Sequence, residues 1–152
     1  MKGKKSVMYY IKSEQSFDAA HFLMDYEGKC RNIHGHRWRV IIEVKSADLQ
    51  SGRQLAGMVV DFSALKKDIK EEVDRFDHAL IVEKDSLKAA TLEAFRDEGF
   101  CLVEIDFRPT AEQLAKYFFD KMGARGYQVK SATVYETLNN CATYEEDTDV
   151  TV

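Results

Sequence analysis

The residues best suited to chemistry in this chain gather at positions 30–36, which read Cys-Arg-Asn-Ile-His-Gly-His. This stretch holds two of the four histidines and one of the three cysteines. His34 and His36 are separated by one residue, so on a β-strand both imidazoles would lie on one face and could bind one ion. For a His-x-His pair taken alone, a turn or core histidine that pairs with backbone carbonyls is the more common role.

A third histidine, His21, ends the preceding strand pattern directly after two alanines. Neighbouring antiparallel strands bring such positions within a few ångströms of each other. Three neutral imidazoles favour zinc at about 2.0–2.1 Å with an open fourth position, the arrangement of catalytic zinc sites. Cys30 as a fourth ligand would instead close the site and make it structural, and the spacing leaves both alternatives open.

Cys30 also has an alternative role as a base or nucleophile. It lies between Lys29 and Arg31, and positive charge near a thiol favours the reactive thiolate. Without the nearby histidines, a loop thiol with no role would be the simpler interpretation. Cys101 and Cys141 fall on strand patterns and are expected to be small hydrophobic residues. Three widely spaced cysteines also argue against a disulfide framework.

Two further polar signals lie downstream. Asp77 precedes His78, and a carboxylate can orient an imidazole, although a histidine that ends a helix is common without function. Glu136 follows an apolar strand pattern. A carboxylate there could accept two N–H bonds from a guanidine-like heterocycle edge, and a solvated edge-strand charge is the alternative. Glycine-rich phosphate or dinucleotide fingerprints do not occur in the sequence.

The composition limits the class of protein. A length of 152 residues with 45% hydrophobic content predicts a single domain over 1–152. The 26 acidic and 22 basic residues are scattered and give a formal charge of −4, which argues against non-specific nucleic-acid binding. No apolar run approaches the roughly 20 residues that span a bilayer, and no signal-peptide core follows the basic start. We therefore expect a cytoplasmic protein with neither a nucleic-acid nor a membrane partner.

Hydrophobic spacing predicts the elements that position these residues. Strands are expected at 7–21, 34–44, 101–107, 129–136 and 141–144, and helices at 62–76, 86–98 and 110–122. Asp61 can cap the first helix, and Thr110 can cap the third with Gln113 in the capping-box position. The order predicts an α+β fold with antiparallel hairpins at both ends and helices on one face of a sheet. The acidic tail after Glu145 is expected to lack regular structure.

These segments resemble the 6-pyruvoyl-tetrahydropterin synthase superfamily in order and spacing. The resemblance is carried by Phe17-Asp-Ala-Ala-His21, Cys30-x3-His34-Gly-His36, Val60-Asp61-Phe62 with Leu65-Lys66, Asp77-His78, Pro109-Thr110-Ala-Glu112 and Val134-Tyr135-Glu136-Thr137. It spans 17–144, and motifs in series are more specific than any one alone. The three-residue gap between the cysteine and His-Gly-His is similar to that of the bacterial 6-carboxy-tetrahydropterin synthases of queuosine biosynthesis, whereas eukaryotic-type pyruvoyl enzymes usually have a longer gap.

The resemblance implies the tunnelling fold: an antiparallel four-stranded sheet core with helices on one face, and sheets joined into a barrel by oligomerisation. The implied partner is a second copy of the chain, commonly within a homo-hexamer that has active sites at subunit interfaces. The implied small-molecule substrate is 7,8-dihydroneopterin triphosphate. It would be converted to 6-carboxy-5,6,7,8-tetrahydropterin, acetaldehyde and triphosphate, without a nicotinamide or flavin.

The resemblance also implies roles for single residues. Zinc, one ion per subunit, would be held by His21, His34 and His36, and Cys30 would move protons at the substrate side chain. The remaining implied roles are orientation of the acid/base His78 by Asp77, binding of the pterin N–H edge by Glu136, and pocket positions for Thr110 and Glu112. No role follows for 86–107.

Three alternatives to this function stay open. One is an enzyme of the same fold that eliminates triphosphate and stops at the pyruvoyl product. The second is a non-catalytic pterin- or purine-binding module with structural zinc, and the third is a purely structural oligomer.

Overall fold

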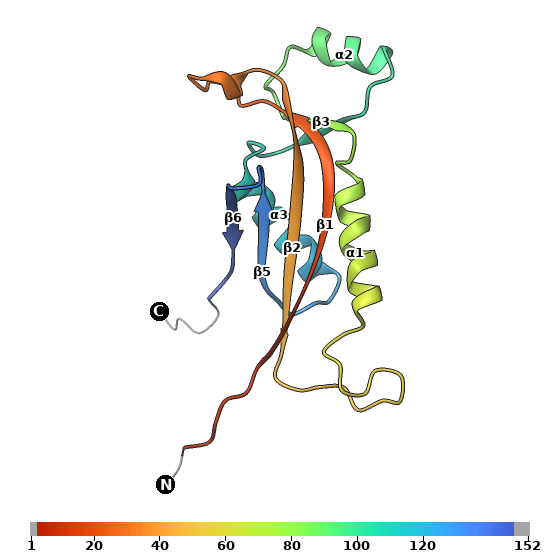
Figure 1. Cartoon of the computed structure of the whole chain (residues 1–152). Coiled ribbons are helices and arrows are strands. Elements are labelled where there is room, and N and C mark those ends of the chain that lie inside the picture. The colour runs from red at the N-terminus through yellow and green to blue at the C-terminus, as the bar shows by residue number, and fades with distance from the viewer. Residues whose placement is uncertain (1–2, 148–152) are drawn as a thin grey trace.

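The computed structural model of the chain describes residues 3–147. Its elements, shown in Figure 1, are β1 (Tyr9–His21), a short 3-10 helix η1 (Lys29–Arg31), β2 (His34–Ser46), α1 (Phe62–Asp74), β3 (Ala79–Glu83), α2 (Ala89–Asp97), β4 (Leu102–Ile105), α3 (Ala111–Ala124), β5 (Val129–Tyr135) and β6 (Cys141–Tyr144). Residues 145–147 have no regular structure, as expected for the acidic tail. Positions 148–152 of that tail lie outside the described residues.

The strands form one six-stranded mixed sheet in the order β4-β3-β1-β2-β5-β6. The prediction of four antiparallel strands is correct for β1, β2, β5 and β6. It is wrong for the sheet as a whole, because β3 adds in parallel to β1 and β4 adds in parallel to β3. Helix α2 connects β3 to β4, and parallel neighbours require such a crossover connection.

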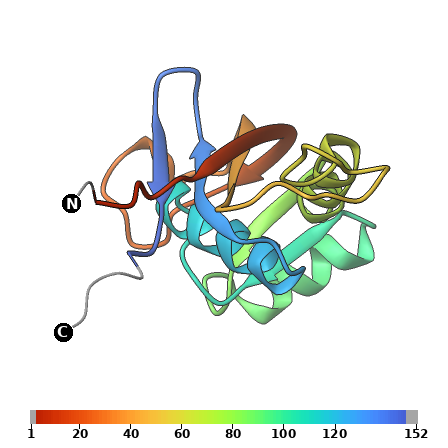
Figure 2. The ribbon, with the colours of Figure 1, turned by 90° about the horizontal axis from the view of Figure 1, so that it is seen from below.

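Helices α1 and α3 pack on one side of the curled sheet, against β1 and against β5 and β6 respectively (Figures 1 and 2). Between these layers lies the core, whose largest fully buried side chains are those of Trp38, Phe17, Phe76, Phe118, Ile42, Leu65, Ile69, Ile81, Leu114 and Met122. Full burial of one such side chain contributes roughly 1.5–3 kcal/mol. Helix α2 departs from the predicted arrangement, since it buries none of its residues and stands beyond the end of β3 at the top of Figure 1.

The register of β1 and β2 decides where the histidines lie. Phe17 pairs with Trp38 in the core, and four residues later His21 pairs with His34. Successive side chains of a strand alternate between faces, so the histidines share the helix-covered face but lie at the strand ends. The packed core thus continues directly into the histidine cluster.

The opposite face of β1 and β2 is polar. Ion pairs join Lys12 to Glu43 at 3.4 Å and Asp18 to Arg37 at 3.4 Å across the two strands. Helices α1 and α3 occupy the other side. The opposite face is therefore a sheet surface that carries ion pairs between the two strands.

The caps predicted for the helices are confirmed. The side chain of Asp61 accepts the Ser63 N–H at 2.7 Å, and Thr110 Oγ1 accepts the Gln113 N–H at 3.3 Å. Helix α3 runs through the glycine at 123, where it was predicted to stop, and the positive φ of 100° occurs at Gly126. A glycine inside a last turn costs about 1 kcal/mol but does not break the helix.

All three cysteines are free thiols, as predicted. Cys101 and Cys141, expected to act as small hydrophobic residues on strands, are both exposed. Cys101 lies just before β4, and Cys141 points to the uncovered side of an edge strand, so neither position is enclosed. Within residues 3–147, none of the helices is long and apolar enough to cross a membrane.

Candidate metal centre and active site

Three histidines converge at the ends of β1 and β2. The nitrogens that His21, His34 and His36 can offer to a metal all lie within 4.8 Å of one another. The Nε2 atoms of His21 and His34 are 3.1 Å apart. Among the described residues, this is the group of histidine, cysteine and acidic side chains that can hold a metal ion.

The hydrogen bonds of the Nδ1 atoms show which tautomer His21 and His34 adopt. His21 Nδ1 lies 2.7 Å from the carbonyl oxygen of Pro109, and His34 Nδ1 lies 2.7 Å from that of Asn32. A carbonyl oxygen only accepts, so Nδ1 carries the proton and donates in both residues. In the neutral rings, both Nε2 atoms then point lone pairs at each other. A shared cation relieves that repulsion, and the carbonyls orient the rings as in known metal sites.

Two further observations fit a metal ion. His36 Nε2 is buried and has no hydrogen-bond partner in the described part of the chain, and such an atom is costly unless something binds it. Burial lowers the pKa of His21 to about 4; the Pro109 carbonyl opposes this shift, and charge on His34 or His36 adds to it. Burial also lowers the pKa of His36, against the opposing effect of Glu136. Neutral imidazoles are the form that ligates metal.

Trp38 supports the cluster from the core side. Its ring meets those of His21 and His36 edge-on, with centroids 4.9 and 5.4 Å away. Its Nε1–H donates to the Ala19 carbonyl at 3.2 Å. Trp38 lies two residues after His36 on the same strand face, and this spacing could have suggested the contact. The contact of His21 with the Pro109 carbonyl could not be predicted from side-chain patterns, because it is made by a backbone group.

Glu136 lies closer to the histidines than its predicted role in substrate binding required. It follows β5 directly, and its Oε1 is 3.3 Å from His21 Nε2 and 3.6 Å from His36 Nε2. The antiparallel pairing of β2 with β5 brings it there, because Tyr135 lies opposite Arg39 near the start of β2.

Cys30 is not part of the metal-ligand group. It lies in η1, is half-buried, and its carbonyl accepts the Leu23 N–H at 2.9 Å. Among the described residues, this arrangement favours the open site over the alternative in which Cys30 closes it.

Asp77 and His78 form a pair beside β1. Asp77 Oδ1 is 3.1 Å from His78 Nδ1 and accepts the Asp18 N–H at 3.0 Å, and the His78 N–H donates to the Asp18 carbonyl at 2.6 Å. The Asp18 N–H lowers the pKa of Asp77, with His78 adding and burial opposing. His78 has a φ of 58°, an uncommon conformation for a residue other than glycine. The backbone of Asp18 therefore fixes this pair.

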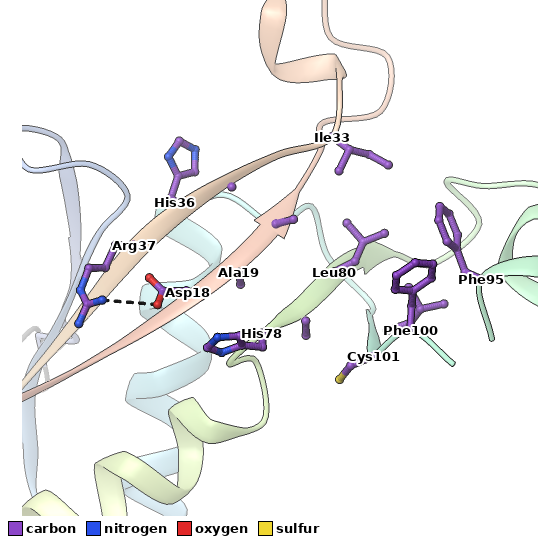
Figure 3. A pocket seen from close by; sticks show the side chains of 14 residues that line it. Asp18, Ala19, Ile33, His36, Arg37, His78, Leu80, Phe95, Phe100 and Cys101 are labelled. Carbon is purple, nitrogen blue, oxygen red and sulfur yellow. Dashed lines mark hydrogen bonds and ion pairs between the residues drawn. The ribbon is translucent and has the colours of Figure 1, made fainter. Parts of the chain in front are cut away.

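The Asp77–His78 pair lies apart from the histidine cluster, although His36 and His78 are both among the residues that line one pocket. In Figure 3, His36 and His78 lie on either side of the β1–β2 pair. His78 lines a cavity of about 660 Å³ whose apolar walls are Ile33, Leu80, Phe95, Phe100 and Leu102. Ala19 pairs with both His36 and Ala79, so two strand spacings, about 10 Å, separate the backbones of the two sites.

The two remaining candidates lie at the start of α3. Thr110 is the N-cap, and Glu112 is an exposed acidic residue of the first turn. An acidic side chain there stabilises a helix through its dipole. In this structure, Thr110 caps α3 and Glu112 lies in its first turn, beside Pro109, whose carbonyl holds His21.

Known proteins are similar to this chain in sequence and in fold. A family model described as 6-pyruvoyl tetrahydropterin synthase matches residues 10–147. The 6-carboxy-5,6,7,8-tetrahydropterin synthase of Haemophilus influenzae is 34% identical over 145 residues, which cover 91% of this chain and all of that protein. The protein of the same name from Synechocystis is 36% identical over 139 residues, with coverages of 90% and 93%.

Solved structures show the same fold. An uncharacterized protein from Wolinella succinogenes superposes with a TM-score of 0.78 at 24% identity and covers 93% of this chain and 100% of its own. The 6-pyruvoyl tetrahydropterin synthase of Plasmodium vivax gives 0.67 at 19% identity, with coverages of 93% and 99%. The resemblance predicted from the motifs is thus confirmed, and the chain belongs to the 6-pyruvoyl tetrahydropterin synthase family.

Proposed function

We propose that the protein is a zinc-dependent 6-carboxy-5,6,7,8-tetrahydropterin synthase that acts on 7,8-dihydroneopterin triphosphate in queuosine, or 7-deazaguanine, biosynthesis. The observation that carries this proposal is the convergence of three imidazoles, two of which, His21 and His34, donate their Nδ1 protons to backbone carbonyls. It occurs in a chain that is 34% and 36% identical to two proteins of that name over nine-tenths of its length.

Each group has a defined task in the proposed reaction. His21, His34 and His36 hold the ion, and the bonds of His21 and His34 to backbone carbonyls keep those two rings oriented. Zinc, when bound, supplies Lewis acidity to hydroxyl oxygens of the substrate side chain. Cys30 moves protons at the side-chain carbons, and His78, oriented by Asp77, is its acid/base partner.

The proposed reaction needs no external redox cofactor. Hydrogen moves from the side chain to the ring, so the ring is reduced while the side chain is oxidised. Triphosphate leaves, and cleavage of a side-chain carbon–carbon bond with addition of one water releases acetaldehyde and leaves the carboxylate on the ring. Glu136 binds the amino and ring N–H edge of the pterin, for which a carboxylate is a good acceptor. Thr110 and Glu112 are further members of the pocket.

The proposal extends to assembly. The chain acts as a single domain that joins others through the sheet edges to form a barrel, in a hexamer with active sites between subunits. The separation of His78 from the histidine cluster supports this, because a second copy could supply the missing partner. The free edges of β4 and β6 also support it, since exposed sheet edges are commonly paired or covered.

The function is tested by incubating zinc-loaded protein with 7,8-dihydroneopterin triphosphate and measuring acetaldehyde and the tetrahydropterin product. Release of acetaldehyde is expected. A pyruvoyl product without acetaldehyde would assign the earlier-stopping enzyme, and tight binding without turnover would assign a binding module.

The role of Cys30 is tested by Cys30→Ala, with the exposed Cys141→Ala as a matched control. Loss of a positioned acid/base is expected to lower turnover roughly 10²- to 10⁴-fold while zinc content stays unchanged. Unchanged turnover would remove Cys30 from the mechanism, and lost zinc would make it a ligand.

A further inference from the structure

We propose that Glu136 is a fourth metal ligand in the substrate-free protein and that it leaves the metal when substrate binds. The first half of this inference depends only on the metal centre. The second half rests on the proposed function, in which the same carboxylate binds the pterin edge.

Glu136 lies at ligand spacing from two of the three histidines. Tetrahedral zinc with ligands at about 2.0–2.2 Å places neighbouring ligand atoms roughly 3.3–3.6 Å apart. The Oε1 atom of Glu136 lies 3.3 Å from His21 Nε2 and 3.6 Å from His36 Nε2, and the Nε2 atoms of His21 and His34 are 3.1 Å apart. The carboxylate oxygen therefore has ligand spacing to His21 and His36 but lies outside the group that the three histidines form, so it completes the site by a movement of its side chain toward the ion.

The hydrogen-bond pattern supports the same conclusion. His21 uses its Nδ1 proton on the Pro109 carbonyl, so its Nε2 presents a lone pair to the Glu136 oxygen. Two acceptor atoms 3.3 Å apart repel each other. His36 Nε2, which also faces Glu136, is buried without a hydrogen bond in the described part of the chain. A cation bound by all these atoms removes both difficulties.

The chain holds this carboxylate in place. The Glu136 N–H donates to the Asn140 carbonyl at 3.0 Å, and Thr137 Oγ1 accepts the Asn140 N–H at 3.1 Å, which fixes the turn between β5 and β6. The Glu136 side chain is 31% exposed, and its ion-pair partners among the described residues are His21 and His36. This placement differs from that of an edge-strand charge in water.

Such a ligand couples metal binding to substrate binding. With Glu136 bound, the centre has four protein ligands and is closed, which is typical of structural sites. When the carboxylate turns to the N–H edge of a heterocycle, a position opens at the metal. Because linkage is reciprocal, the factor by which a pterin bound to Glu136 weakens metal binding equals the factor by which the metal weakens pterin binding.

The test measures the metal and not turnover. Zinc affinity of the whole chain is determined by competition with a chromophoric chelator, and the visible spectrum of the cobalt(II)-substituted protein is recorded. Glu136→Gln keeps the shape of the side chain and removes its charge. We expect zinc to bind about 10- to 100-fold more weakly, on the scale known for changes around metal ligands, and the cobalt spectrum to change.

The matched control is Glu98→Gln, which makes the same charge change at the exposed end of α2 and is expected to leave both readouts unchanged. If Glu136→Gln keeps the wild-type zinc affinity and cobalt spectrum, the proposal is wrong and Glu136 serves substrate alone. If that variant does not fold, the cobalt spectrum of the wild type is compared with and without an unreactive pterin. A spectrum that stays the same when the pterin binds overturns the proposal. Failure of the wild type to release acetaldehyde would contradict the proposed function but not the zinc result.

Discussion

Replacing His21 and His34 by alanine, one at a time, separates metal ligation from structural support. Both variants remove one imidazole from the metal centre, so both are expected to lose zinc. They should differ in the stability of the metal-free protein, because His21 is 0% exposed whereas His34 is only partly buried at the end of β2.

The size of the difference follows from what each ring touches. His21→Ala leaves the buried Pro109 carbonyl without its donor, at a cost of about 1–3 kcal/mol. It also opens a cavity against Trp38, so the total is roughly 2–4 kcal/mol. His34→Ala breaks a bond to Asn32, a carbonyl two residues away in an exposed loop, which costs about 1 kcal/mol or less.

The assay is urea unfolding in excess chelator, with protein concentration held equal because an oligomer is more stable at higher concentration. Elemental analysis of the purified proteins reports zinc. Equal losses of stability in the two metal-free variants would refute the reasoning from burial. Full zinc content in either variant would remove that residue from the ligand set.

Two further predictions concern other groups. Asp77→Asn should lower turnover roughly 10²- to 10⁴-fold while zinc content stays the same, measured by the acetaldehyde assay; an equal loss of zinc would contradict the separation of the two sites. Burial and the hydrogen bond to Asp68 raise the pKa of Tyr127 from 10.0 to about 12. Between these pH values the unfolded chain loses this proton and the folded chain keeps it, so stability is present below pH 10 and lost as pH rises toward 12. Tyr127→Phe should show a smaller loss of stability in urea unfolding across this window, and identical pH profiles would disprove the contribution of the Tyr127 hydroxyl.

The long antiparallel strands could be predicted because one face is buried and the other is polar. Along β2, Trp38, Val40 and Ile42 alternate with Arg37 and Arg39, and this period of two defines both the strand and the face that carries its histidines. The alternation places the histidines on the buried face, and the observed register pairs His21 with His34.

The parallel part of the sheet could not be predicted in the same way. Strand β3 is five residues long and has an apolar run with little alternation, and such a run cannot be assigned by periodicity alone. Its parallel direction depends on where α1 and α2 carry the chain, which is a property of the packed fold and not of the local sequence.

The sequence predicted which histidines belong to the site, but not the other groups that contact them. His21, His34 and His36 carry a spacing signal, whereas Glu136 reaches them only because β5 pairs with β2 after a long intervening stretch of chain. A sequence pattern does not show which backbone carbonyls will contact a given side chain. The carbonyl of Pro109, which sets the tautomer of His21, therefore became visible only in the folded structure.

Strand β1 links the two candidate functional sites. It presents His21 on the helix-covered face, and the backbone of Asp18 holds Asp77 and His78 at its other edge. Metal ligation thus needs only parts of one chain, and a single copy should bind zinc. In the proposed oligomer, His78 serves the metal centre of a second copy, so proton transfer depends on assembly and metal binding does not. Dilution that separates the copies should therefore abolish turnover per chain while the zinc affinity of each chain stays the same, and turnover that survives in separated copies would contradict a shared site.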